Sequence, residues 1–169
     1  MIKRKDILKI AIDSPAAAGA GTLGKAISKH YNLFYLDTGK IYRFIAYLKI
    51  KFPKKFNNKF IKSKIKSLKM KDLTNNYLLT DEVGTEASVI SKIKSIRKMV
   101  HTFQINFAYN PPKKYKGSCL DGRDITYKIV PDADFKFFIT ANVKTRALRR
   151  YKELKSLKKN NLRRSVKKH

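Results

Sequence analysis

The chain has 169 residues, of which 40 are lysine or arginine and 12 are aspartate or glutamate, giving a formal net charge of +28. Its hydrophobic content of 43% is ordinary for a globular protein, and no apolar run approaches the roughly 20 residues of a membrane helix. These values favour one globular domain and exclude a bundle of membrane-spanning helices. We expect no signal peptide, because only a short apolar run follows the basic N-terminus.

The lysine excess has two interpretations. Lysine and arginine in bulk neutralise phosphates, as in a nucleic-acid-binding protein. These lysines, however, are scattered over the whole chain and accompany many Ile, Asn, Phe and Tyr residues, a composition that AT-rich codons favour. We therefore expect no specific nucleic-acid partner and no membrane partner. The single cysteine, Cys119, cannot form an internal disulfide and indicates a reducing compartment, so we expect a cytoplasmic protein.

The first predicted elements are a buried strand at residues 7–12, a loop of small residues at 14–21, and a helix directly after it. This order is typical of a phosphate-binding loop. Backbone N–H groups in such a loop turn inward to hold a di- or triphosphate, and the dipole of the following helix adds to the attraction. The sequence therefore predicts a nucleotide-phosphate site near the N-terminus.

The loop meets only part of the consensus, which is Gly, four residues, Gly, Lys and a hydroxyl residue. Gly19 and Thr22 fit the second glycine and the hydroxyl residue, whereas Ser14 stands at the first glycine and Ala20 at the lysine. Lys25 lies one helical turn further on, and we expect it to face water rather than to replace the missing cation. The loop is thus predicted to hold phosphate with backbone groups but without its usual charge.

The chain continues with a brief strand at 33–36, a turn at 37–39 and a helix that a proline ends. Residues 54–76 are rich in lysine and asparagine with scattered apolar residues, and we interpret them as a loosely packed excursion. Helical spacing of apolar residues follows at 86–108, with an interruption near 93–95.

The last predicted elements are a strand at 117–121, which leads into Asp-Gly-Arg-Asp, a strand at 135–140, and a helix from 143 to about 157 that Asn142 can cap. Strands alternating with helices predict an α/β fold with a parallel sheet covered on both faces. Ligands of such sheets gather beyond the carboxyl ends of the strands. This rule brings the phosphate loop, the turn at 37–39 and the Asp-Gly-Arg-Asp segment to the same edge.

These segments together resemble the bacterial cytidylate kinases, a P-loop family with the nucleoside monophosphate kinase fold. Residues 12–22 are similar to that family's Ile-Asp-Gly-Pro opening, and its acceptor motif Asp-Ser/Thr-Gly-x-x-Tyr-Arg occurs unchanged at 37–43. Its later signature resembles Asp-Gly-Arg-Asp-Ile at 121–125, Pro-Asp-Ala at 131–133 and Arg-Ala-x-Arg-Arg at 146–150. The order and spacing agree over nearly the whole chain.

The resemblance implies transfer of the γ-phosphate of ATP to CMP or dCMP with Mg²⁺, in pyrimidine nucleotide metabolism. It implies that the donor phosphates bind the phosphate loop and two later arginines, namely Ser14, Pro15, Ala16, Ala17, Ala18, Gly19, Ala20, Gly21, Thr22, Arg149 and Arg150. Thr22 would also bind the magnesium ion. The implied CMP site consists of Thr38, Arg43, Asp121, Arg123 and Asp124. Arg43 and Arg123 are the implied catalytic residues, which hold the acceptor phosphate.

The chain departs from the family pattern beyond its loop. Thr126 replaces a glycine, and Ile105 stands where the family usually has an arginine. The family also continues past this chain with an arginine-bearing lid, a last strand and a helix, which we expect to be missing here.

We divide the chain into a cytidylate-kinase-like domain at 1–155, in which 54–108 approximates the acceptor-binding insertion, and a basic tail at 156–169. Two alternatives to an active kinase stay open: a weak or inactive nucleotide-binding remnant, and a basic nucleic-acid-binding protein on a P-loop scaffold. The preferred donor, the choice between CMP and dCMP and the oligomeric state are also open.

Overall fold

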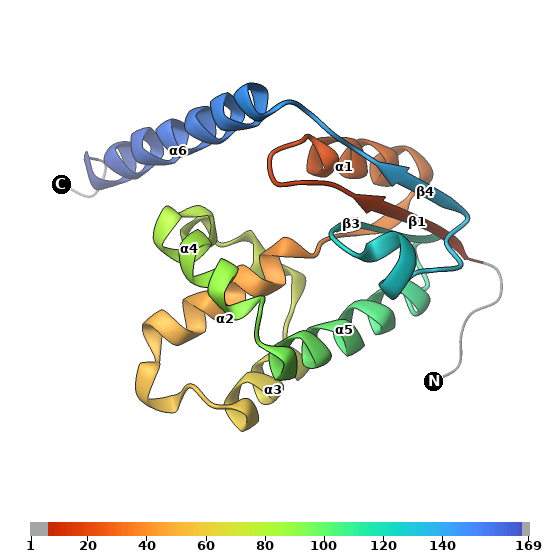
Figure 1. Ribbon diagram of the computed structural model, residues 1–169, viewed down its shortest axis with the longest axis horizontal. Helices are drawn as coiled ribbons and strands as arrows, with labels where there is room; N and C mark the ends of the chain where they lie inside the picture. Colours follow the sequence, from red (N-terminus) through yellow and green to blue (C-terminus); the bar gives the residue numbers. More distant parts are fainter. Residues whose placement is uncertain (1–6, 167–169) are drawn as a thin grey trace.

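A parallel sheet organises the molecule (Figure 1). The computed structural model describes the backbone of residues 7–166 and the side chains of residues 7–156. Within these residues the sheet has four strands, β1 (Leu8–Asp13), β2 (Leu33–Asp37), β3 (Gly117–Gly122) and β4 (Phe135–Phe138), which lie in the order β2-β3-β1-β4. This confirms the predicted α/β fold with a parallel sheet, although β4 ends two residues before the predicted strand does.

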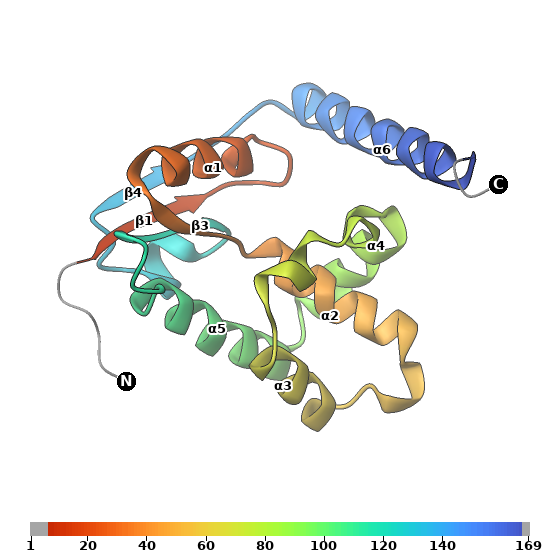
Figure 2. The same cartoon turned by 180° about the vertical axis from the view of Figure 1, so that it is seen from behind.

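Within residues 7–166 the structure has six α-helices, which are α1 (Ala20–Tyr31), α2 (Gly39–Lys51), α3 (Asn58–Lys66), α4 (Asp81–Ile90), α5 (Lys94–Tyr109) and α6 (Val143–Val166). Short 3₁₀ segments lie at η1 (Pro53–Lys55), η2 (Met70–Thr74) and η3 (Asn76–Leu79), and a π-helical turn, η4, at Ile125–Ile129. Helices α1 and α5 cover opposite faces of the sheet, and α2, α3 and α4 form a helical lobe beside it (Figures 1 and 2).

Side chains alternate between two cores along β1, as a strand covered on both faces requires. Ile10 and Ile12 pack with α1 in a small core, whereas Ala11 faces a larger core that extends into the helical lobe. Cys119 belongs to the small core and is fully buried, as expected for a packing residue.

The segment at 54–76 is not the loose excursion that its composition indicated. It forms η1, α3 and η2, and its apolar residues Ile61, Ile65 and Leu73 are buried in the larger core. Ile61 and Ile65 stand four residues apart, so they share one face of α3. This interpretation was wrong because two or three well-placed apolar residues anchor a segment that is otherwise lysine-rich.

The helical region at 86–108 is interrupted as predicted, but the break lies at residues 91–93 rather than 93–95, since α4 ends at Ile90 and α5 begins at Lys94. Asn142 caps α6 as predicted, with its side-chain oxygen accepting a hydrogen bond of 2.8 Å from the Thr145 N–H. Helix α6 runs on to Val166, past its predicted end, and the remainder of the predicted tail lies outside the described residues. No helix within residues 7–166 has both the length and the apolarity needed to cross a bilayer.

Candidate active site

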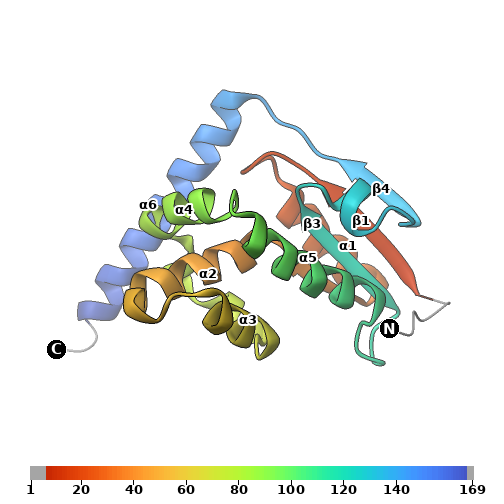
Figure 3. The same cartoon turned by 60° about the horizontal axis from the view of Figure 1, so that its bottom comes forward.

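A cleft of about 1720 Å³ opens at the carboxyl ends of the strands, between the phosphate loop and the helical lobe. Figure 3 shows the lobe beside this edge of the sheet, with α6 reaching from β4 toward it. Every residue that the sequence indicated for donor or acceptor binding lines the cleft, from Ser14 to Thr22, at Thr38, Arg43, Asp121, Arg123 and Asp124, and at Arg149 and Arg150. Their individual roles stay predictions, but the topology does bring the three motifs together.

The phosphate loop turns sharply before α1. Gly19 has a φ of 110°, a left-handed conformation that favours glycine, and Ala17 is also left-handed with a φ of 61°. Helix α1 then begins at Ala20, whose side chain is buried. Because the first N–H groups of a helix lack partners four residues earlier, the start of α1 presents donors to the cleft.

Two arginines of α6 donate hydrogen bonds to carbonyl groups of this loop. The Arg149 guanidinium donates to the Ala18 carbonyl at 2.7 Å and to the Ala17 carbonyl at 3.3 Å, and Arg146 donates to the Ala16 carbonyl at 3.5 Å. A carbonyl and the N–H of the same peptide point in opposite directions, so these arginines contact the loop from its carbonyl side. They stabilise its shape and bring positive charge close to its donor groups.

Two carboxylates meet where β2 and β3 end. Asp37 and Asp121 are opposite each other in the register of these parallel strands. Burial, and after it the nearby charge of Asp37, raise the pKa of Asp121 to about 7, although a hydrogen bond from the Tyr35 hydroxyl to its Oδ1 (2.9 Å) acts in the opposite direction. Burial likewise raises the pKa of Asp37. The pair therefore favours a nearby cation.

This carboxylate pair fits a magnesium site. Mg²⁺ is typically held by one or two carboxylates together with substrate phosphates, and prefers oxygen ligands. The position of a Cβ on Gly21 would lie 3.6 Å from Asp121 Oδ2, so the N-terminus of α1 passes directly beside that carboxylate. Thr22, the residue predicted to bind the ion, is the next residue of this turn. The sequence analysis named neither carboxylate for a metal: it assigned Asp121 to the CMP site and gave Asp37 no role, although its place after a buried strand was a usable signal.

Arg43 of α2 forms part of the cleft wall that the sequence predicts to bind the acceptor. Its guanidinium is half-buried and donates to the Leu78 carbonyl at 2.7 Å. Burial lowers the pKa of Arg43, and the charge of Arg150 lowers it further. Gly84 leaves space for this guanidinium, since a Cβ there would come within 3.2 Å of Arg43 Nη2. The arginine is thus held rigidly at the wall of the cleft.

Asp124 is the centre of a second polar cluster. Its Oδ2 forms an ion pair with Arg97 of α5 at 2.8 Å, and its Oδ1 accepts a hydrogen bond of 2.6 Å from the Tyr127 hydroxyl. The Tyr127 bond lowers the pKa of Asp124 most, and Lys128 and Arg97 lower it further. Asp124 is therefore a carboxylate at neutral pH.

The sequence analysis missed part of this wall. Arg97, Ser88 of α4, and His101 and Gln104 of α5 also line the cleft, on the side of Asp124. They lie within a region recognised only by its helical spacing, which identifies the buried face of a helix but not the polar residues that reach a distant cleft. The pattern had no signal for them.

Asp13, the last residue of β1 before the phosphate loop, is bonded to the segment that follows β3. Its Oδ1 accepts a hydrogen bond from the Ile125 N–H at 2.7 Å, and its Oδ2 accepts bonds from the Thr126 N–H at 3.1 Å and the Thr126 hydroxyl at 2.5 Å. The threonine that replaces the family's glycine thus adds a third hydrogen bond to a carboxylate that is only 7% exposed. We call these four groups the Asp13 clasp.

Helix α6 also reaches across the cleft. Arg150 donates to the Leu79 carbonyl at 3.1 Å and forms ion pairs with Asp81 at 2.9 Å and Glu153 at 2.6 Å. The adjacent turn of α6 holds the phosphate loop through Arg146 and Arg149. One helix therefore connects the loop to the helical lobe.

Comparison with known proteins gives a consistent result. The family model described as cytidylate kinase matches residues 10–168. The chain is 46% identical over 146 residues to a cytidylate kinase of Bartonella tribocorum, covering 86% of this chain and 66% of the relative. It is 40% identical over 148 residues to a cytidylate kinase of Rhodospirillum rubrum, covering 87% of this chain and 70% of the relative. The chain thus spans about two thirds of the length of the curated relatives that it matches.

Proposed function

The chain belongs to the cytidylate kinase family, and from this premise we propose that it transfers the γ-phosphate of ATP to CMP or dCMP, forming ADP and CDP or dCDP. The observation that carries the proposal is that the cleft is lined by the phosphate loop, by a pair of carboxylates and by two acceptor-side arginines. Phosphoryl transfer depends on aligning two nucleotides and neutralising the charge on the transferred phosphoryl group, and the protein contributes little covalent chemistry.

On the donor side, backbone N–H groups from Gly19 onward hold the phosphates of ATP. The Thr22 hydroxyl and the carboxylates of Asp37 and Asp121 would hold the magnesium ion. Magnesium, when bound, neutralises charge on the donor phosphates. Arg149 and Arg150 add positive charge from α6 at the same end of the cleft.

On the acceptor side, Arg43 and Arg123 bind the CMP phosphate, because a planar guanidinium can donate two parallel hydrogen bonds to phosphate oxygens. Arg43 is already fixed through its Nη1 by the Leu78 and Thr80 carbonyls and keeps its Nε and Nη2 hydrogens for the ligand. Thr38, which is buried directly before α2, also lines the cleft and adds a polar contact.

Asp124 and Arg97 select the base. Cytosine carries an exocyclic amino group, which donates hydrogen bonds, beside ring atoms that accept them. A carboxylate matches the amino group and a guanidinium matches the acceptors, and the 2.8 Å ion pair holds the two in register. Uracil has an oxygen in place of the amino group, and that oxygen would face the Asp124 carboxylate. The pair therefore favours CMP over UMP.

We place this reaction in the cytoplasm, since Cys119 is a buried free thiol and nucleotide substrates are cytoplasmic metabolites. The comparisons give no support to either alternative, an inactive remnant or a nucleic-acid-binding protein, because the relatives are named for the kinase.

The test is ADP formation from Mg·ATP with and without CMP, with UMP as the matched control acceptor. We expect turnover that saturates with CMP and exceeds the acceptor-free background, with UMP a poorer substrate. The variant Ala20→Lys, which restores the consensus loop, is assayed beside the native chain. If neither protein shows CMP-dependent ADP formation, the proposed function is wrong.

A further inference from the structure

We infer that Lys25 of α1 supplies to the donor phosphates the positive charge that the loop lacks at Ala20. The inference rests on the proposed function, because it states how the donor site of that kinase is completed. It assigns a ligand-binding role to a residue that the sequence alone placed in water, away from the site.

The gap in the loop is local and electrostatic. Ala20 is the first residue of α1 and its small side chain is buried, so the tip of the helix offers the cleft backbone N–H groups and no cation. Three or four negative charges of an ATP tail would gather at this point. A cation that reaches it strengthens binding far more than backbone groups alone, because charge-assisted hydrogen bonds are roughly twice as strong as neutral ones.

The helical geometry directs Lys25 toward the gap. Lys25 follows Gly21 by four residues, so the two positions lie one above the other on the same face of α1. Side chains in a helix lean toward its N-terminus, and Gly21 has no side chain to obstruct the lysine. The long stem of Lys25 therefore extends along α1 toward the loop and the ends of the strands.

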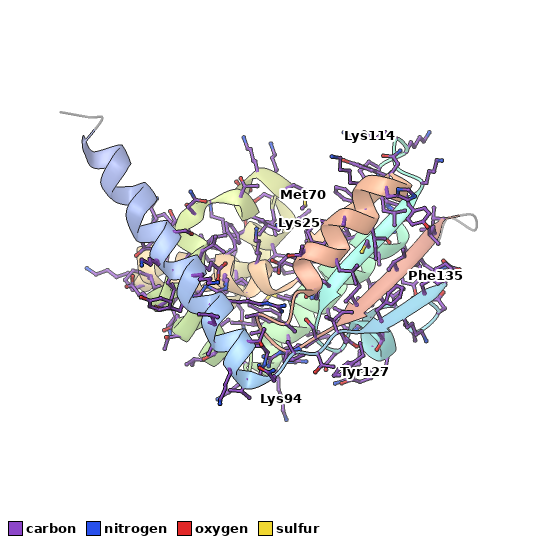
Figure 4. All side chains as sticks on the ribbon, turned by 90° about the horizontal axis from the view of Figure 1, so that it is seen from above. Lys25, Met70, Lys94, Lys114, Tyr127 and Phe135 are labelled. Carbon is purple, nitrogen blue, oxygen red and sulfur yellow. The ribbon has the colours of Figure 1, made fainter. Side chains whose placement is uncertain are left out.

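The surroundings of Lys25 agree with this direction. Its side chain lines the cleft, and Figure 4 labels it on the side of α1 that faces the helical lobe. Its charge lowers the pKa of both Asp37 and Asp121, which stand at the ends of two neighbouring strands. Lys25 is thus exposed, as the sequence indicated, but it is exposed on the wall of the site.

The ammonium group of Lys25 is also available to a ligand. Among the residues whose side chains the structure describes, it has neither a hydrogen bond nor an ion pair within 4.0 Å. Arg146 and Arg149 of α6 are already bonded to loop carbonyls and act from the carbonyl side. Lys25 approaches from the strand side, where the carboxylates of the proposed magnesium site lie.

The test measures Mg·ATP binding by titration calorimetry, without acceptor and without turnover. We compare the native chain with Lys25→Ala, Ala20→Lys and the double variant. The matched control is Lys29→Ala, which removes an exposed lysine of α1 one turn further from the loop. We expect Lys25→Ala to weaken ATP binding about tenfold to a hundredfold, the range for losing a hydrogen bond to a charged group. Lys29→Ala should change it less than about twofold, as expected for a screened surface charge.

The loop lysine provides the decisive comparison. If Lys25 serves the same phosphates, the effect of Lys25→Ala falls to less than about threefold in the Ala20→Lys background, since one cation then replaces the other. Equal effects of Lys25→Ala and Lys29→Ala would overturn the inference. ATP binding by Ala20→Lys but not by the native chain would also overturn the inference. It would show that ATP binding requires a lysine at position 20, as in the consensus loop. Absence of ATP binding in every variant overturns the proposed function itself.

Discussion

Removing the hydroxyl of Thr126 tests the Asp13 clasp most directly. The change is Thr126→Val, which keeps the shape of the side chain and the backbone N–H bond to Asp13 but deletes the bond of 2.5 Å to Oδ2. A hydrogen bond to a charged acceptor contributes about 1.5–3 kcal/mol. Because Thr126 is only partly buried, we expect a loss near the lower end, about 1.5 kcal/mol of the free energy of unfolding.

Asp13→Asn should cost more. The amide keeps one acceptor oxygen, but its NH₂ group faces an N–H that had been bonded to the carboxylate, and that N–H then lies buried without a partner. We expect a loss of about 3 kcal/mol, since an unsatisfied buried donor and the weakened bonds both contribute. In the double variant the hydroxyl has only a neutral partner to lose, so the two losses should fall short of their sum by about 1 kcal/mol.

Urea unfolding followed by far-UV circular dichroism measures these free energies, provided that the slope of the transition is unchanged. The matched control is Thr102→Val, which removes an exposed hydroxyl bonded at 3.1 Å to the Lys98 carbonyl and should change stability by less than about 0.5 kcal/mol. If Thr126→Val behaves like this control, or if the two clasp variants are strictly additive, the reasoning about the clasp is refuted.

Three further predictions concern the sheet and the two substrates. Gly117→Ala should destabilise the protein by about 3 kcal/mol or more in the urea assay, because the new Cβ would lie 1.9 Å from the Leu8 carbonyl oxygen; a near-native midpoint would contradict the strand spacing. Arg97→Ala should raise KM for CMP about tenfold or more and leave KM for ATP unchanged, since it removes the guanidinium that pairs with Asp124 and leaves Asp124 paired with Lys128; equal effects on both substrates would count against a role in base binding. Arg149→Ala should raise KM for ATP several-fold and spare CMP, because the arginine contacts the phosphate loop; an unchanged KM for ATP would show that the loop keeps its shape without it.

The sheet and the location of the site were predictable because both follow from local pattern. Short apolar runs identified the strands, and the rule for carboxyl ends placed the phosphate loop, the turn at 37–39 and the segment at 121–124 at one edge. The structure has this arrangement. None of these steps requires knowledge of a contact between distant residues.

The features that were missed depend on such contacts. The α3 segment is held by Ile61 and Ile65, whose burial depends on α5 packing against them rather than on local composition. Arg97 meets Asp124 across 27 positions of sequence, and no period in the chain relates them. Whether Lys25 lies on the wall of the site depends on where β2 and β3 end relative to α1, and the sequence of the helix does not specify this.

Helix α6 has a kinetic consequence. The guanidinium group of Arg149 is bonded to the phosphate loop, and that of Arg150 is bonded to Asp81 of the helical lobe. Both groups therefore have acceptors before a nucleotide arrives. An incoming phosphate that takes one of these bonded N–H groups must exchange with the acceptor that the group already has. Each exchange replaces one bond with another, so it costs little in equilibrium affinity but adds a barrier to association. Loosening α6 from the lobe, by removing Asp81, should therefore quicken nucleotide capture more than it alters the dissociation constant.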